Sequence, residues 1–288
     1  MTLVEQPQRA ARIAAVGDLH CREAQREEIA AAFAAIERDV DVILLAGDLT
    51  THGEPEQALI LADACRPLDT PVLAVLGNHD WHVNRAAEVV EALEDAGIVV
   101  LERNHAILEV ADIELGVVGL KGFVGGFDGH RIPDFGEPLL RTVYAEMSAD
   151  VEALDAGLRA IAASPLRIVL LHYAPVAATL EGEPREIWAF LGSERLATPI
   201  AEHLATWPLT IAVDRVHPAR DEMPRLSASG RAFAQATWRH LVFGIVMGEL
   251  ERRLNAPADP DLPPYEHIIT SNGHGKIEHV ATAPGGDG

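Results

Sequence analysis

Three apolar segments that each break at a glycine constrain this chain more than any other feature of its sequence. Residues 13–16, 42–46 and 72–76 are short apolar runs with the composition of buried strands. Glycine lets the backbone turn sharply, so the polar residues that follow are displayed just beyond the strand ends. Those residues are carboxylates, an amide and imidazoles, namely Asp18, His20, Asp48, Asn78, His79 and Asp80.

The spacing of these segments predicts that their ends meet. About thirty residues separate Asp18 from Asp48, and Asp48 from Asn78, which is roughly one strand–helix–strand unit. Right-handed crossovers make such strands parallel, and open α/β sheets bind ligands at the carboxyl edge. We therefore expect the polar side chains to converge there. Mixed oxygen and imidazole ligands suit Mn, Fe, Zn or Co rather than calcium.

At these residues the sequence resembles a known family. Asp18-x-His20, Gly47-Asp48 and Gly77-Asn78-His79-Asp80, in this order and spacing, are similar to the first three motifs of the calcineurin-like metallophosphoesterases. The later Leu171-His172-Tyr173-Ala174-Pro175 is similar to the fourth motif, a histidine at a strand end. The resemblance covers about residues 12–175, and the bacterial cyclic-nucleotide phosphodiesterase-like branch is the most similar.

The resemblance implies both a fold and a metal site. The fold would be α/β, with two packed mixed β-sheets flanked by helices. The site would hold two divalent cations. Asp18 and His20 would bind one ion, Asp48 would bridge both, and Asn78 and His172 would hold the second.

Two further residues receive roles in catalysis. A hydroxide between the cations, its pKa lowered by them, would attack phosphorus in line with the leaving oxygen. His79 lies next to a ligand without being needed as one, which suits a general acid for the leaving oxygen. Asp80 is expected to orient the imidazole of His79. Asp and Asn after Gly are also ordinary turn residues, and only their recurrence in several motifs indicates a site.

The family's final Gly-His-x-His motif is not present in that form, and three explanations stay open. His217, in the run Asp-Arg-Val-His, is at the right point in the order to supply one imidazole, with a water or Asp214 in the other position. Residues 272–276 resemble the motif with its second histidine lost. The third explanation is that the segment after Val213 is not the family's own ending. We therefore divide the chain into a metallophosphoesterase-like domain, 1–213, and a divergent C-terminal segment, 214–288.

The segments between the motifs predict the remaining elements. Helical spacing or helix-end signals favour helices at about 22–38, 55–65, 84–96 and 138–163. Strands are expected at 98–101, 105–110, 113–119 and 166–171, the first three antiparallel in a second sheet packed on the first. Beyond His172 we expect helices at 186–190, 195–204 and 232–254, a strand at 208–213, and a loosely ordered tail from residue 256.

Residues 119–138 are glycine-rich and follow no regular pattern. A loop of this length within a compact domain is usually functional or disordered. We interpret it as a mobile lip over the metal edge, in which Phe123 or Phe127 meets the leaving group and His130 and Arg131 are further candidates for substrate contact. The alternative is a solvent loop whose aromatic side chains pack.

Composition excludes several functions. A net charge of −21 argues against a general nucleic-acid or membrane-surface binder. No apolar run is long enough to span a bilayer, and the polar stretch before residue 12 is not a secretory signal. Cys21 and Cys65 make no disulfide framework, which fits a cytoplasmic location.

These observations predict a cytoplasmic, metal-dependent hydrolase of small phosphate esters. A phosphodiester is favoured because nothing in the sequence resembles a phosphoprotein-recognition surface. One alternative is a phosphomonoesterase on the same site. The other is a catalytically impaired, metal-binding scaffold that has lost the fifth motif. The number of metal ions per chain and the turnover of an aryl diester distinguish the enzyme from the scaffold.

Overall fold

The computed structural model describes residues 10–180, 183–204, 268–272 and 276–282. Its first sheet contains the three strands that carry the motifs. β1 (Ala10–Val16), β2 (Val42–Ala46), β3 (Val72–Val75) and β4 (Val99–Val100) are neighbours in this order and all run parallel. The parallel pairing of β4 with β3 corrects the expectation of an antiparallel strand at 98–101.

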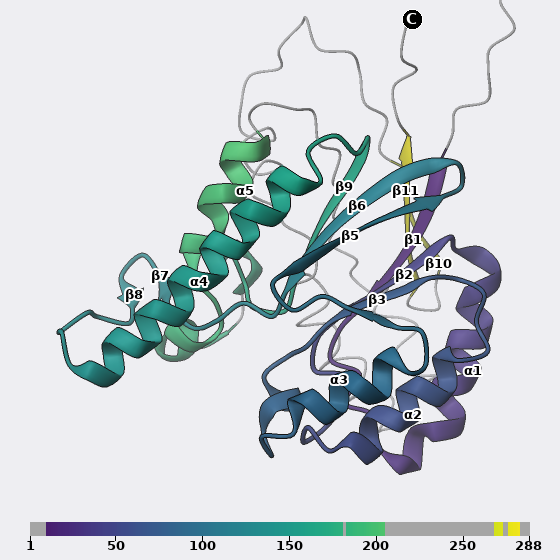
Figure 1. Cartoon of the computed structure of the whole chain (residues 1–288), viewed down its shortest axis with the longest axis horizontal. Helices are drawn as coiled ribbons and strands as arrows, with labels where there is room; N and C mark the ends of the chain where they lie inside the picture. Colours follow the sequence, from purple (N-terminus) through teal and green to yellow (C-terminus); the bar gives the residue numbers. More distant parts are fainter. Residues whose placement is uncertain (1–9, 181–182, 205–267, 273–275, 283–288) are drawn as a thin grey trace, which may run out of the picture.

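Three helices connect these strands and cover one face of the sheet (Figure 1). They are α1 (Arg26–Ile36), α2 (Pro55–Cys65) and α3 (Ala86–Glu94). The 3₁₀ turns η1 (Glu23–Gln25) and η2 (Glu37–Asp39) extend α1 at both ends, and together these elements account for the helix expected at 22–38. All five residues of β2 are buried, because a central parallel strand is covered on both faces.

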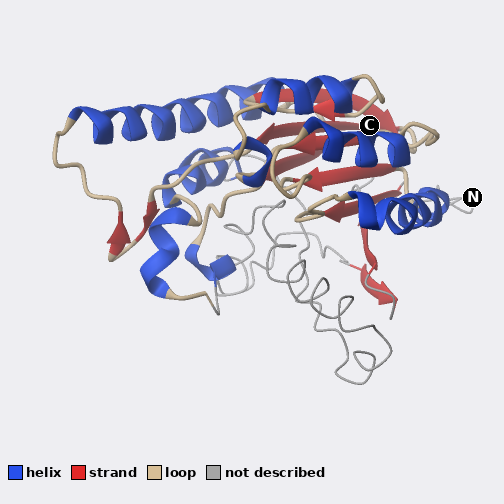
Figure 2. Cartoon of the chain, turned by 90° about the horizontal axis from the view of Figure 1, so that it is seen from below, coloured by secondary structure: helices blue, strands red, loops and turns tan. Residues whose placement is uncertain are grey.

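The second sheet combines antiparallel and parallel pairing. β5 (Asn104–Val110) and β6 (Ile113–Leu120) form a hairpin, and β9 (Leu166–Leu171) lies parallel to β6. The hairpin turns at Ala111 and Asp112, both with positive φ, as two-residue hairpin turns require. Figure 2 shows the long helix α4 (Pro138–Ala160) running along one side of the strands, and it shares a buried cluster with α5 (Ala197–Leu204) and this sheet.

The two sheets pack face to face through a shared apolar core. Leu44 and Val75 of the first sheet lie in one buried cluster with Val117 and Leu170 of the second. The layers are therefore helices, sheet, sheet and helices, which confirms the predicted α/β fold of two packed mixed sheets. Among the described ranges, no helix has both the length and the apolar character needed to cross a bilayer.

The C-terminal segment contributes a hairpin to the first sheet. β10 (Ile268–Asn272) and β11 (Lys276–Thr282) pair with each other, and β11 pairs antiparallel with β1. At residues 268–272 and 276–282 this corrects the expectation of a loosely ordered tail from residue 256. The elements expected at 208–213 and 232–254 lie outside the described residues, and the domain boundary after Val213 stays a prediction.

The packing of the two sheets generates a stability prediction. Leu44→Ala removes a fully buried side chain from the shared core, and such a change costs about 2–5 kcal/mol. Leu139→Ala makes the same chemical change at a side chain that is 77% exposed, where the expected effect is within about 0.5 kcal/mol. Urea denaturation measures both free energies of unfolding, and equal midpoints for the two variants would contradict the packing described.

Candidate metal centre

The loops that follow β1 and β2 are held in an unusual backbone conformation. Asp18, His20 and Asp48 have φ values of 55°, 44° and 50°, a left-handed conformation that is strained for residues with a side chain. Hydrogen bonds between the two loops hold it. The Asp18 N–H donates to the Gly47 carbonyl and the His20 N–H donates to the Asp48 carbonyl, both at 2.9 Å. Backbone strain of this kind clusters at functional sites because the surroundings must over-determine it.

Two glycines leave the space in which the site is built. A Cβ atom at Gly77 would lie 2.1 Å from Oδ1 of Asp48, and one at Gly47 would lie 2.6 Å from Nδ1 of His172. No real Cβ contact is that short, so any side chain at either position would displace a polar group of the site. The glycines after β2 and β3 are therefore required by packing, and Gly47, with a φ of 88°, is also required by turn geometry.

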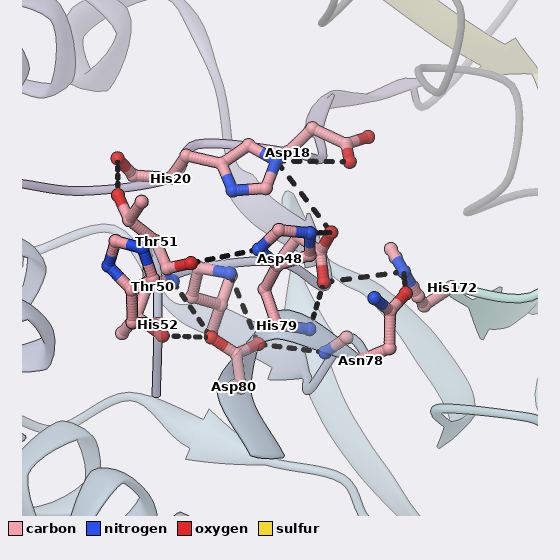
Figure 3. A network of polar contacts seen from close by, with 12 residues as sticks. Asp18, His20, Asp48, Thr50, Thr51, His52, Asn78, His79, Asp80 and His172 are labelled. Carbon is pink, nitrogen blue, oxygen red and sulfur yellow. Dashed lines mark hydrogen bonds and ion pairs between the residues drawn. The ribbon is translucent and has the colours of Figure 1, made fainter. Parts of the chain in front are cut away.

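The carboxylate of Asp48 is the centre of the cluster (Figure 3). Its oxygens lie 3.4 Å from Nε2 of His172, 3.7 Å from Nε2 of His20 and 3.9 Å from Nε2 of His79. The His79 backbone N–H donates to Oδ1 of Asp48 at 2.9 Å and fixes its orientation. Nε2 of His20 also lies 3.7 Å from Oδ1 of Asp18. The sequence-based expectation that these strand ends converge agrees with this geometry.

Two of the imidazoles are aimed by backbone carbonyls. Nδ1–H of His172 donates to the Ala46 carbonyl at 2.9 Å, and Nδ1–H of His79 donates to the Thr51 carbonyl at 2.8 Å. A carbonyl only accepts, so the hydrogen of each neutral ring is on Nδ1 and the lone pair of Nε2 faces Asp48. This arrangement is typical of histidines that bind metal ions.

The donor set fits divalent cations. Nε2 of His172 lies 3.2 Å from Oδ1 of Asn78 and 3.4 Å from Oδ1 of Asp48, so electron-rich atoms face one another. Ligand atoms of His20, Asp48 and His79 all lie within 4.8 Å of one another. Ligands of one ion lie up to about 4.4 Å apart when each bond is about 2.2 Å long, which is close to this separation. The sequence analysis assigned His79 only to acid catalysis, whereas the geometry also places its Nε2 within this group.

The cluster also perturbs His20. The pKa of its imidazole is raised because the Asp18 carboxylate interacts with the ring, an effect that outweighs burial, and the charge of Asp48 adds to it. The environment of this ring thus favours positive charge. A proton and a metal ion compete for such a nitrogen.

Asp80 has a different place from the one expected. Its carboxylate is fully buried and accepts four hydrogen bonds, from the N–H groups of Leu49, Thr50 and Gly77 and from the Thr50 hydroxyl, at 2.6–3.1 Å. Its four hydrogen bonds go to other groups, and the Thr51 carbonyl orients the imidazole of His79 instead. Burial raises the pKa of Asp80, and these hydrogen bonds oppose that effect. Asp80 therefore joins the loops after β2 and β3.

The cluster lies in a cleft of about 250 Å³. The cleft is lined by Asp18, His20, Asp48, Asn78, His79, His172, Tyr173, Glu183, Phe190 and Leu191. The last four were not predicted. Tyr173 stands beside a motif histidine, which is a signal that sequence reasoning could have used. Glu183 to Leu191 include the 3₁₀ helix η5 (Arg185–Phe190), which agrees with the helix expected at 186–190, but no sequence pattern marks these residues as part of a cleft.

The four residues expected in a mobile lip do not line this cleft. Phe127 is 2% exposed and packs edge-to-face on Trp188, so its expected contact with a leaving group is wrong. His130 also lies against Trp188, Arg131 forms an ion pair with Glu194, and the ring of Phe123 lies under the Lys121 ammonium.

The segment instead follows the packed alternative, through the short hairpin of β7 (Gly126–Phe127) and β8 (His130–Arg131). His217 and Asp214 lie outside the described residues.

A two-sheet α/β fold with imidazoles and carboxylates gathered at the carboxyl edge defines a metallohydrolase architecture. The family model for calcineurin-like phosphoesterases matches residues 11–191, and the chain belongs to this family, whose members use divalent metal ions.

Individual relatives share only a low sequence identity with this chain. A probable glycerophosphodiester phosphodiesterase from Arcobacter nitrofigilis is 27% identical over 88 residues, which make up 30% of this chain and 30% of that protein. Phosphopantetheinyl hydrolase from Mycobacterium tuberculosis is 14% identical, with 68% of this chain and 80% of that chain covered at a TM-score of 0.44. The protein TT1561 of Thermus thermophilus is 19% identical, with 67% and 78% covered at a TM-score of 0.40.

The role of glycine in making space for the carboxylate generates a prediction. Gly77→Ala should displace the Asp48 side chain and lower the metal content per chain, because its Cβ would lie 2.1 Å from Oδ1. Gly17→Ala is the matched control at the end of β1, where the nearest atom lies 3.4 Å away and nothing must move. Metal analysis after loading with Mn²⁺ and desalting measures the difference. Circular dichroism checks that both variants fold. Equal metal content would contradict the space argument.

Proposed function

We propose that this protein is a phosphoester hydrolase that cleaves small phosphodiesters with the help of two divalent cations. The observation that carries the proposal is the arrangement of three imidazole nitrogens at 3.4–3.9 Å around one buried carboxylate. Asp18 and His20 would hold one cation, and Asn78 and His172 the other, with Asp48 between them. The donor types support Mn, Fe, Zn or Co.

The bound cations would supply a water molecule of lowered pKa and neutralise the charge of the phosphoryl oxygens. The chain supplies the positions. The bond from the His79 N–H holds the Asp48 carboxylate, and the Ala46 carbonyl holds the ring of His172 with Nε2 toward it. Asp80, through its four hydrogen bonds to the loops, keeps the ends of β2 and β3 at a fixed separation.

His79 is the residue best placed to move a proton. Its ring is anchored through Nδ1 to the Thr51 carbonyl, and about a third of the side chain is exposed in the cleft. As an imidazolium it would donate the Nε2 proton to the leaving oxygen and keep its Nδ1 hydrogen bond throughout. A second role is supported by the grouping of His79 with His20 and Asp48, namely that of a metal ligand.

Two observations support a phosphodiester as substrate and a cytoplasmic location. The Arcobacter relative is named as a glycerophosphodiester phosphodiesterase, although the match covers 30% of its length. Cys21 and Cys65 are free, buried thiols, as is usual for proteins of reducing compartments.

The first functional prediction concerns the central carboxylate. Asp48→Asn keeps the size of the side chain and an acceptor for the His79 N–H, but it removes the charge that two cations would share. Turnover of bis(4-nitrophenyl) phosphate should fall to background, and at least one metal ion per chain should be lost. Asp128→Asn, whose side chain is 98% exposed, is the control and should change neither value.

The unaltered protein provides the reference for that comparison. It is stripped with a chelator and reloaded separately with Mn²⁺, Fe²⁺, Zn²⁺ or Co²⁺. Two ions per chain with turnover are expected. One ion or none without turnover would favour the metal-binding scaffold. Full metal content and a near-normal rate in the Asp48→Asn variant would refute the two-cation assignment.

The second functional prediction separates the two roles of His79. Acid catalysis contributes about 10²–10⁴-fold and matters most for poor leaving groups. His79→Gln should therefore lose far more rate on glycerophosphoglycerol, which releases an alkyl alcohol, than on bis(4-nitrophenyl) phosphate. Metal content should be unchanged. His105→Gln, an exposed histidine on β5, is the control. Equal losses on both substrates together with loss of metal would instead make His79 a ligand.

A further inference from the structure

We infer that Glu183 makes the site selective for substrate charge, by disfavouring phosphomonoester dianions relative to phosphodiester monoanions. This inference rests on the proposed function, because it assigns a preference to the same cleft. It names a specificity-determining residue that none of the motifs contains.

Glu183 shares the cleft with the metal-binding cluster but comes from another part of the chain. The cluster lies at strand ends, whereas Glu183 belongs to the segment between β9 and α5. Its backbone is held on both sides. The N–H donates to the Leu180 carbonyl at 2.9 Å, and the carbonyl accepts the Trp188 indole N–H at 3.2 Å. Leu180 and Trp188 pack with buried Phe127, so the side chain of Glu183 starts from a fixed point in the lining.

No cationic side chain of the described residues neutralises the carboxylate of Glu183. Within the described ranges this carboxylate forms neither a hydrogen bond nor an ion pair. Two cationic side chains of this region are engaged elsewhere. The Arg185 guanidinium lies 5.4 Å from the centre of the Trp188 ring, and the Lys121 ammonium donates to the Gly122 carbonyl and lies 5.0 Å from the centre of the Tyr173 ring.

A negative charge in the lining distinguishes substrates by their charge. Near pH 8 a phosphodiester carries one negative charge and a phosphomonoester carries two, since the second pKa is about 6. Cations at Asp48 attract both, whereas Glu183 repels the monoester about twice as strongly. The extra negative charge of the monoester is repelled by Glu183 across the width of a small, hydrated cleft. This repulsion should lower kcat/KM for the monoester about threefold to tenfold relative to the diester. More distant acidic groups contribute less, because salt screens charges beyond about 8–10 Å.

The test compares two substrates that release the same 4-nitrophenol. The values of kcat/KM are measured for 4-nitrophenyl phosphate and methyl 4-nitrophenyl phosphate at pH 8, on the metal-loaded full chain and its Glu183→Gln variant. The monoester-to-diester ratio should rise about threefold to tenfold in the variant. The gain should shrink as salt increases, which a purely structural effect would not do. Glu186→Gln removes the same charge from an exposed residue outside the cleft lining and should change the ratio little.

The outcomes separate the inference from the function on which it rests. An unchanged ratio in Glu183→Gln, or an equal fall of kcat/KM for both substrates, overturns the inference. The proposed function still stands in that case if the unaltered protein turns over the diester. An equal rise of the ratio in Glu186→Gln also overturns it, because the effect would then belong to the net charge. No turnover of either substrate by the metal-loaded, unaltered protein would refute the proposed function and the inference together.

Discussion

The site depends on the space around one carboxylate. Asp48 is 4% exposed, stands in a left-handed backbone conformation and faces three imidazole nitrogens. A buried carboxylate is costly unless positive charge or hydrogen bonds compensate it. Gly47 and Gly77 provide the room, and the neighbouring loops provide the hydrogen bonds. Bound cations would compensate the negative charge of this buried carboxylate. Metal binding should therefore stabilise the fold as well as enable chemistry.

The second sheet contributes His172 to the cluster that the strand ends of the first sheet form. His172 stands at the end of β9, yet its Nδ1–H donates to the carbonyl of Ala46, the last residue of β2. One ring thus joins the two sheets at the edge where the ligands meet. Asn78, from the first sheet, and His172, from the second, would share one cation. The apolar contact between the sheets therefore sets the distance between Asn78 and His172, and the core has a direct role in the geometry of the candidate site.

The sequence predicted where the residues at the strand ends lie better than it predicted the segments around them. A glycine after an apolar run indicates the end of a buried strand. The regular strand–helix spacing then predicts that these strand ends meet at one edge of a sheet, so the positions of Asp18 and Asp48 could be predicted from the sequence alone. Aromatic residues in irregular segments have no such rule. Phe127 was expected to contact the substrate and is in the core. Phe190 lies in the helix η5, where a helix was expected, but its place in the cleft lining was not predicted. Tertiary packing decides between these outcomes.

The partners of buried and cleft-lining carboxylates, and the order of strands in the first sheet, could not be predicted from local sequence patterns either. Asp80 was expected to hold an imidazole because the two residues are adjacent, but its buried oxygens satisfy N–H groups of a loop some thirty residues away. Glu183 carries no pattern that marks it as part of a cleft. The pairing of β11 with β1 joins segments that are far apart in the chain, a contact that periodicity within either segment does not encode.

That last pairing has a consequence for how the protein is made. During translation β1 leaves the ribosome long before β11, because every other element of the fold is made between them. The outer edge of β1 therefore stays unpaired until β11 has been made. An unpaired strand edge is a template for pairing with other chains. Domains generally fold from the N-terminus as they emerge, so a sheet that needs a late strand delays its own completion. The first sheet is therefore complete only after residues 276–282 have been made.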